Sequence, residues 1–122
     1  MSIQLAVAQF SPRKGDYAAN LKKLGDIFAQ IDALDPRPQR LCLPESALTG
    51  YFLEGGVRDV AITAGGLARD LNEVYRNRVT TPRMLDLALG FYEEFSNKLY
   101  NSAIYVTLGG GDAEIRHVHR KM

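Results

Sequence analysis

Short apolar segments separated by an amphipathic stretch constrain this chain more than any other feature. Residues 3–10 (IQLAVAQF) and 40–43 (RLCL) are short apolar runs, and between them residues 17–34 place apolar side chains three or four positions apart. The first run indicates a strand buried on both faces, the second run indicates another short strand, and the spacing between them indicates one face of a helix. Because parallel strands need a long crossover connection, this arrangement predicts a parallel β-α-β unit.

The remaining sequence predicts one more helix and three more strands. The helix is expected over residues 67–78, and the strands over 84–92, 100–108 and 114–121, with a glycine-rich turn at 109–112 before the last strand. The predicted order is therefore β-α-β-α-β-β-β. This order is typical of an α/β domain in which parallel strands are followed by hairpins.

Length and composition exclude several classes of protein. The chain has 122 residues, of which 46% are hydrophobic, so it can form one core and is not a disordered chain. The net charge is +1 with no basic stripe, so we expect no nucleic-acid partner. No apolar run approaches the roughly 20 residues that span a bilayer, so we expect no membrane partner. The single cysteine suits a reducing compartment, and we expect a cytoplasmic location.

Two charged residues near the ends of predicted strands are candidates for chemistry. Glu45 comes just after the strand at 40–43, where α/β folds place their ligands. If it is partly desolvated, its pKa rises and it can act as a general base; the alternative is an ordinary loop residue. Lys121 ends the last predicted strand, where a fixed positive charge held in a pocket can stabilise an oxyanion. The alternative for Lys121 is an exposed basic edge strand.

Five other side chains have weaker claims. Glu93 and Asn101 lie at predicted strand ends, where both are also ordinary residues. His117 and His119 form an H-x-H pair without a third ligand at suitable spacing, so we predict no metal site. Cys42 lies inside an apolar strand, and we expect an inert buried thiol.

Four segments, in order and covering nearly the whole chain, resemble the nitrilase superfamily, the carbon–nitrogen hydrolases. AVAQFSPRKGDYAAN is similar to the family's opening strand and helix, LCLPESALTGY to its first glutamate segment, GFYEE with YNSA to its second, and HRKM to its lysine segment. The resemblance implies a four-layer α-β-β-α sandwich, usually assembled into oligomers. Residues 1–122 would form the first half of that fold.

The resemblance also implies an activity. Family members use a Glu–Lys–Cys triad on a small-molecule amide or nitrile, without a cofactor. The glutamate falls on Glu45, the lysine on Lys121 and a supporting active-site glutamate on Glu93. Tyr51 and Phe52 are candidates for the pocket lining.

The third member of the implied triad is not in this chain. In the family, the cysteine lies a few tens of residues beyond the lysine, whereas Cys42 precedes Glu45. We therefore expect residues 1–122 to be a partial, truncated hydrolase domain that is inactive alone. Its unpacked face predicts a homo-oligomer or association with the missing half. The alternative is a non-catalytic α/β module, either a truncated pseudoenzyme or an oligomerisation partner.

Overall fold

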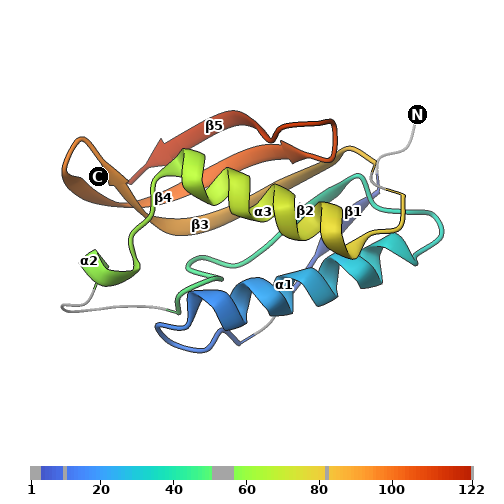
Figure 1. The fold of residues 1–122 in the computed structure, drawn as a ribbon, viewed down its shortest axis with the longest axis horizontal. Helices are drawn as coiled ribbons and strands as arrows, with labels where there is room; N and C mark the ends of the chain where they lie inside the picture. Colours follow the sequence, from blue (N-terminus) through green and yellow to red (C-terminus); the bar gives the residue numbers. More distant parts are fainter. Residues whose placement is uncertain (1–3, 10, 51–56, 82, 122) are drawn as a thin grey trace.

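The computed structural model describes residues 4–9, 11–50, 57–81 and 83–121. It contains five strands and three helices (Figure 1): β1 (Leu5–Val7), α1 (Tyr17–Asp32), β2 (Arg40–Cys42), α2 (Val57–Val60), α3 (Ala64–Arg78), β3 (Leu85–Phe95), β4 (Lys98–Leu108) and β5 (Glu114–Arg120). The predicted α/β order is confirmed, with the four-residue helix α2 as an addition.

The five strands form one sheet whose spatial order follows the chain, β1-β2-β3-β4-β5. β1, β2 and β3 are parallel, and helical crossovers connect them, whereas β3, β4 and β5 are antiparallel neighbours. Ser96 and Asn97 turn β3 into β4 with φ angles of 51° and 61°, as a two-residue hairpin turn requires. Because the turn is this tight, β3 runs to Phe95, beyond its predicted end at residue 92.

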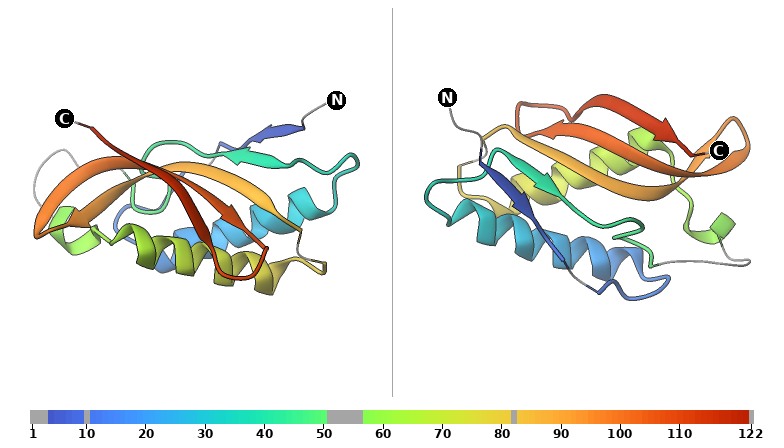
Figure 2. Two further views of the ribbon diagram at one scale, coloured as in Figure 1. Left: turned by 90° about the horizontal axis from the view of Figure 1, so that it is seen from above. Right: turned by 180° about the vertical axis from the view of Figure 1, so that it is seen from behind.

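The two long helices cover one face of the sheet. In the left view of Figure 2, α1 and α3 lie on the same side, and the opposite face carries no helix. The core lies between these two layers. Its fully buried members include Leu24 and Phe28 of α1, Leu71 and Tyr75 of α3, and Leu87, Ile104 and Val106 of the sheet. The described residues therefore form two layers, one of helices and one of sheet.

The first strand differs from its prediction. Leu5 is 59% exposed and Val7 is 69% exposed, while Ala6 between them packs against the core. The expectation of a strand buried on both faces is therefore wrong for one face, because Leu5 and Val7 point away from the helices. Residues 3 and 10, the predicted ends of this strand, lie outside the described residues.

Capping side chains set where the long helices begin. The Asp16 carboxylate accepts a hydrogen bond from the backbone amide of Ala19 at 3.0 Å, and Thr63 accepts one from Gly66 at 3.1 Å. Thr63 explains why α3 begins at Ala64, three residues before its predicted start. Among the helices of the described ranges, none has the length and apolar character to cross a membrane.

Candidate functional site

The loop after β2 carries Glu45 across the face of the sheet that the helices leave uncovered. Gly90 of β3 lies beneath this loop, between Leu89 and Phe91, which point toward the helices. A Cβ atom at Gly90 would lie 3.0 Å from the Cα of Glu45, which is closer than side chains normally approach. The absence of a side chain at Gly90 therefore lets the loop rest directly on β3.

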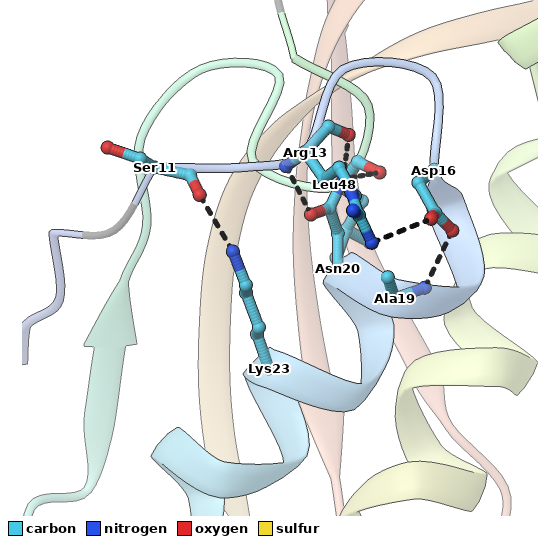
Figure 3. A network of polar contacts seen from close by, with 7 residues as sticks. All are labelled: Ser11, Arg13, Asp16, Ala19, Asn20, Lys23 and Leu48. Carbon is cyan, nitrogen blue, oxygen red and sulfur yellow. Dashed lines mark hydrogen bonds and ion pairs between the residues drawn. The ribbon is translucent and has the colours of Figure 1, made fainter.

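A buried asparagine at the start of α1 anchors the same loop (Figure 3). Asn20 is fully buried, and its side-chain amide donates to the carbonyl oxygens of Arg13 at 2.8 Å and Leu48 at 2.9 Å. Its Oδ1 accepts a hydrogen bond from the Arg13 amide at 2.6 Å. The amide of Gly15 also donates to the carbonyl of Thr49 at 2.7 Å. These bonds fix the loop after β2 to the turn that precedes α1.

Glu45, Lys121 and Asn101 meet on the uncovered face. The Lys121 ammonium donates a hydrogen bond to Oε1 of Glu45, and Asn101 Nδ2 donates to the same oxygen at 3.0 Å. The backbone amide of Lys121 donates to the Asn101 carbonyl at 2.9 Å. Asn101 of β4 thus binds both the backbone of Lys121 and the side chain of Glu45. The structure therefore brings together both residues predicted to lead the chemistry.

The Glu45 carboxylate is held in its ionised form. Hydrogen bonds from Lys121 and, secondarily, from Asn101 lower the pKa of Glu45. The side chains of Glu45 and Lys121 are 44% and 45% exposed, so desolvation is weak. The pKa of Glu45 is therefore lowered, and not raised as partial desolvation of the carboxylate would have predicted. What the site offers is an anion and a cation in contact, facing outward from the sheet.

Glu93 lies on the other face of the sheet, apart from this pair. It is 1% exposed, and alternation along β3 places it on the same side as the buried residues Leu89 and Phe91. Its Oε1 accepts a hydrogen bond from the Ser102 hydroxyl at 2.9 Å, and its Oε2 accepts one from Arg120 Nη2 at 3.0 Å. The resemblance implied a supporting active-site role for Glu93, and the structure shows Arg120 as its charged partner.

The remaining candidates do not join the site. Cys42 is half-buried rather than buried, because alternation along β2 points its side chain toward the uncovered face. His117 and His119 lie opposite Tyr105 and Ala103 in the β4–β5 ladder, and both are exposed. Within the described ranges, no three His, Cys, Asp or Glu side chains come close enough together to hold a metal ion. The predicted pocket residues at positions 51 and 52 lie outside the described residues.

Two further residues have weak signals in the sequence: Asn101, which the structure places at the site, and Arg120, which pairs with Glu93 on the opposite face. Asn101 was read as a strand end, although its position in the YNSA segment was the available signal. Arg120 was not singled out. The sequence signal for Arg120 is the alternation of side chains along a strand, because a residue next to Lys121 must point to the opposite face.

Comparisons with known proteins support a hydrolase fold. No family model matches the sequence, and no curated protein matches it. Among solved structures, an N-terminal amidase superposes with a TM-score of 0.71 at 25% identity, covering 98% of this chain and 28% of its own. An amidase from Nesterenkonia sp. superposes with a TM-score of 0.73 at 21% identity, and the match covers 98% of this chain and 42% of the amidase chain. A carbon–nitrogen hydrolase from Helicobacter pylori G27 superposes with a TM-score of 0.75 at 17% identity, and the match covers 98% of this chain and 39% of the hydrolase chain.

These similarities extend over nearly all of this chain but less than half of each matched structure. At such identities, what the Nesterenkonia and Helicobacter structures share with this chain is the fold. Another Nesterenkonia amidase structure with a TM-score of 0.69 is described as belonging to the nitrilase superfamily. The fold expected from the motifs is therefore confirmed: this chain has the fold of the corresponding part of these amidase and carbon–nitrogen hydrolase structures.

Proposed function

We propose that this chain supplies the base and the oxyanion-stabilising cation of an amide-hydrolysing active site. Glu45 is the general base and Lys121 is the cation. The observation that carries the proposal is their contact on the uncovered sheet face, in a fold shared with amidases. The substrate class is a small amide, because two of the compared structures are amidases.

The proposed reaction uses a cysteine thiol as its nucleophile. An amidase from Nesterenkonia sp. with this fold carries a covalently added acetamide moiety at its active-site cysteine, which supports a thiol in this chemistry. Glu45 takes the proton from the thiol as the sulfur–carbon bond forms, and the carbonyl electron pair moves onto oxygen. Lys121 stabilises that negative charge. The carbon–nitrogen bond then breaks, and the nitrogen leaves as ammonia or an amine with the proton from Glu45. Water hydrolyses the thioester and regenerates the thiol.

The contacts of Cys42 support placing the nucleophile outside these 122 residues. Cys42 lies on β2, ahead of the loop that carries Glu45, and among the described residues it shows no hydrogen bond to Glu45 or Lys121. A nucleophile must lie within hydrogen-bond reach of its base. The proposal therefore assigns the thiol to another segment that covers the exposed face. Such a cover would also remove water from Glu45 and raise its pKa toward that of an effective base.

The test is ammonia release from a panel of amides by the protein that contains this chain. Glu45→Gln and Lys121→Met should each lower the rate by at least about 100-fold, as expected for a general base and an oxyanion-stabilising group. Glu94→Gln and Lys98→Met are matched controls, because both are exposed charges near the β3–β4 turn. Full activity in Glu45→Gln would overturn the proposal.

The 122-residue chain alone provides the second arm of this test. It should release no ammonia. Turnover by the isolated chain that disappears in Cys42→Ala would show that the nucleophile is assigned wrongly. Absence of turnover in the protein with every amide would favour the alternative, a non-catalytic module.

A further inference from the structure

Two consecutive residues at the end of β5 bind two glutamates on opposite faces of the sheet. Arg120 binds Glu93 on the helix-covered face, and Lys121 binds Glu45 on the uncovered face. We infer that the Arg120–Glu93 pair is a positioning device, which fixes the end of β5 so that Lys121 is held against Glu45. This inference rests on the proposed roles of Glu45 and Lys121.

The contacts of the Arg120–Glu93 pair span three strands. Nη2 of Arg120 donates to Oε2 of Glu93 at 3.0 Å, and Nε lies 2.8 Å from Oε1, so the guanidinium meets the carboxylate with two nitrogens. Ser102 of β4 donates to the same carboxylate. Glu93 is almost completely buried, so removing its cation would leave an uncompensated charge in the interior. The pair therefore ties β5 to β3 beneath β4.

Aromatic rings restrain the same guanidinium. The Cζ atom of Arg120 lies 3.8 Å from the centre of the Phe95 ring and 5.8 Å from that of Tyr100. A cation over an aromatic face is attracted by the ring quadrupole. These two rings come from the strand ends that flank the β3–β4 turn. Two kinds of contact therefore hold the Arg120 side chain in place: the ion pair with Glu93 and the cation–π contacts with Phe95 and Tyr100.

Lys121 needs such a restraint because of its place in the sheet. Among the described strands, β5 lies at an edge of the sheet and pairs with β4 alone, and the ladder reaches Arg120 opposite Ser102. Beyond it, the backbone of Lys121 makes one hydrogen bond, to Asn101. Strand ends with few partners open easily, and the lysine side chain is a flexible four-carbon stem. Fixing the neighbouring Arg120 therefore limits where the ammonium of Lys121 can go.

The decisive variant is Glu93→Gln in the 122-residue chain. Glutamine keeps the shape and can still accept the hydrogen bond from Ser102, but it removes the charge that holds Arg120. We expect the Lys121 amide to exchange with solvent about tenfold faster. We also expect the pKa of Glu45, followed by carbon NMR of its carboxyl group, to rise toward the ordinary value of about 4.3. The amide of Leu87 in the centre of β3 reports whether the fold is retained.

The matched control is Asp26→Asn. It removes a carboxylate from another arginine pair, in which Arg78 Nη2 lies 2.7 Å from Asp26 Oδ1 on the exposed side of the helices. This variant should leave the Lys121 amide exchange and the pKa of Glu45 unchanged. If Glu93→Gln fails to fold, Arg120→Lys and Phe95→Leu provide the same readouts. Arg120→Lys keeps a cation for Glu93 but loses the contact through two nitrogens, and Phe95→Leu removes the ring beneath the guanidinium. Both variants should therefore change the Lys121 amide exchange and the pKa of Glu45 in the same direction as Glu93→Gln, but by less.

A folded Glu93→Gln, Arg120→Lys or Phe95→Leu chain in which neither readout moves would overturn the inference, because the pair would then stabilise the fold without positioning Lys121. These readouts do not depend on hydrolysis. If the variants behave as expected and Glu45→Gln still hydrolyses amides, the proposed function fails and the positioning role stands. If Glu45→Gln abolishes hydrolysis and the readouts do not move, the positioning role fails alone.

Discussion

Asn101 donates a 3.0 Å hydrogen bond to the oxygen of Glu45 that Lys121 also contacts, while its backbone carbonyl accepts from the Lys121 amide. Asn101→Ala removes one of the two donors that favour the ionised carboxylate. We expect the pKa of Glu45 to rise toward its ordinary range. In the proposed hydrolase, turnover should fall by about tenfold or less, because the bond is half-exposed to solvent. Carbon NMR titration and ammonia release measure these effects.

Asn77→Ala is the control for this prediction, because Asn77 is exposed on α3, away from the site. An unchanged pKa of Glu45 in Asn101→Ala would show that Lys121 alone holds the carboxylate.

The Glu45–Lys121 pair should make stability depend on pH at the acidic end. The folded-state pKa of Glu45 is lowered, so the pair stabilises the fold above the unfolded-state pKa of about 4.3 and loses this effect as pH falls through the folded value. The contribution should be below about 1 kcal/mol because both side chains are half-exposed.

Urea unfolding at pH 6 and pH 3 measures this contribution. Lys121→Met should lose less stability than the parent chain between these two pH values, whereas Lys98→Met should match the parent. Equal losses in the parent and Lys121→Met would contradict the prediction.

The buried anchor at Asn20 should carry more stability than any exposed polar group of the helices. Asn20→Ala leaves the Leu48 carbonyl without its buried hydrogen bond and removes both bonds to Arg13. Since each unsatisfied buried group costs about 1–3 kcal/mol, we expect a loss of about 2–3 kcal/mol in the free energy of unfolding. Urea denaturation of Asn20→Ala, with Asn77→Ala as the control, measures this loss in the free energy of unfolding. A loss as small as that of Asn77→Ala would contradict the stabilising role of Asn20.

The uncovered face of β1 should drive association of the isolated chain. Leu5 and Val7 are the exposed apolar side chains of this edge strand, and exposed apolar surface at a sheet edge favours self-association. Light scattering over a concentration series should show association that decreases in Leu5→Ser/Val7→Ser. Ile115→Ser is the control, because Ile115 is 40% exposed but lies on β5, at the opposite edge of the sheet from β1. A monomeric parent chain at all concentrations would contradict the prediction.

Local patterns were sufficient to predict the five strands and the two long helices of this fold. The apolar spacing over residues 17–34 predicted α1, which the structure ends at Asp32, and the glycine-rich segment predicted the turn between β4 and β5. At Gly109, φ is +88° and a Cβ atom would lie 2.4 Å from the Arg83 carbonyl oxygen, so glycine is required there. These features depend on neighbouring residues, which the sequence displays directly.

Features that depend on distant parts of the chain could not be predicted in the same way. The exposure of Leu5 and Val7 depends on which face the helices cover. The direction of Glu93 depends on β3 continuing past residue 92, because strand parity then places its side chain on the helix-covered face. The partnership of Glu93 with Arg120 rather than with Lys121 follows from that parity. The same alternation places the side chains of Arg120 and Lys121 on opposite faces of the sheet.

The chain-order arrangement of the sheet has a consequence for how the molecule folds. β3, β4 and β5 are joined by short turns, so their contacts close small loops, whereas pairing β1, β2 and β3 requires closing long helical crossovers. Because closing long loops costs more entropy, the β3–β4–β5 meander should gain hydrogen-exchange protection before β1 and β2 during refolding. Simultaneous protection of all five strands in pulse-labelled exchange would contradict this order. Glu45 and Lys121 are 76 residues apart, so their contact belongs to the last stage of this sequence of events.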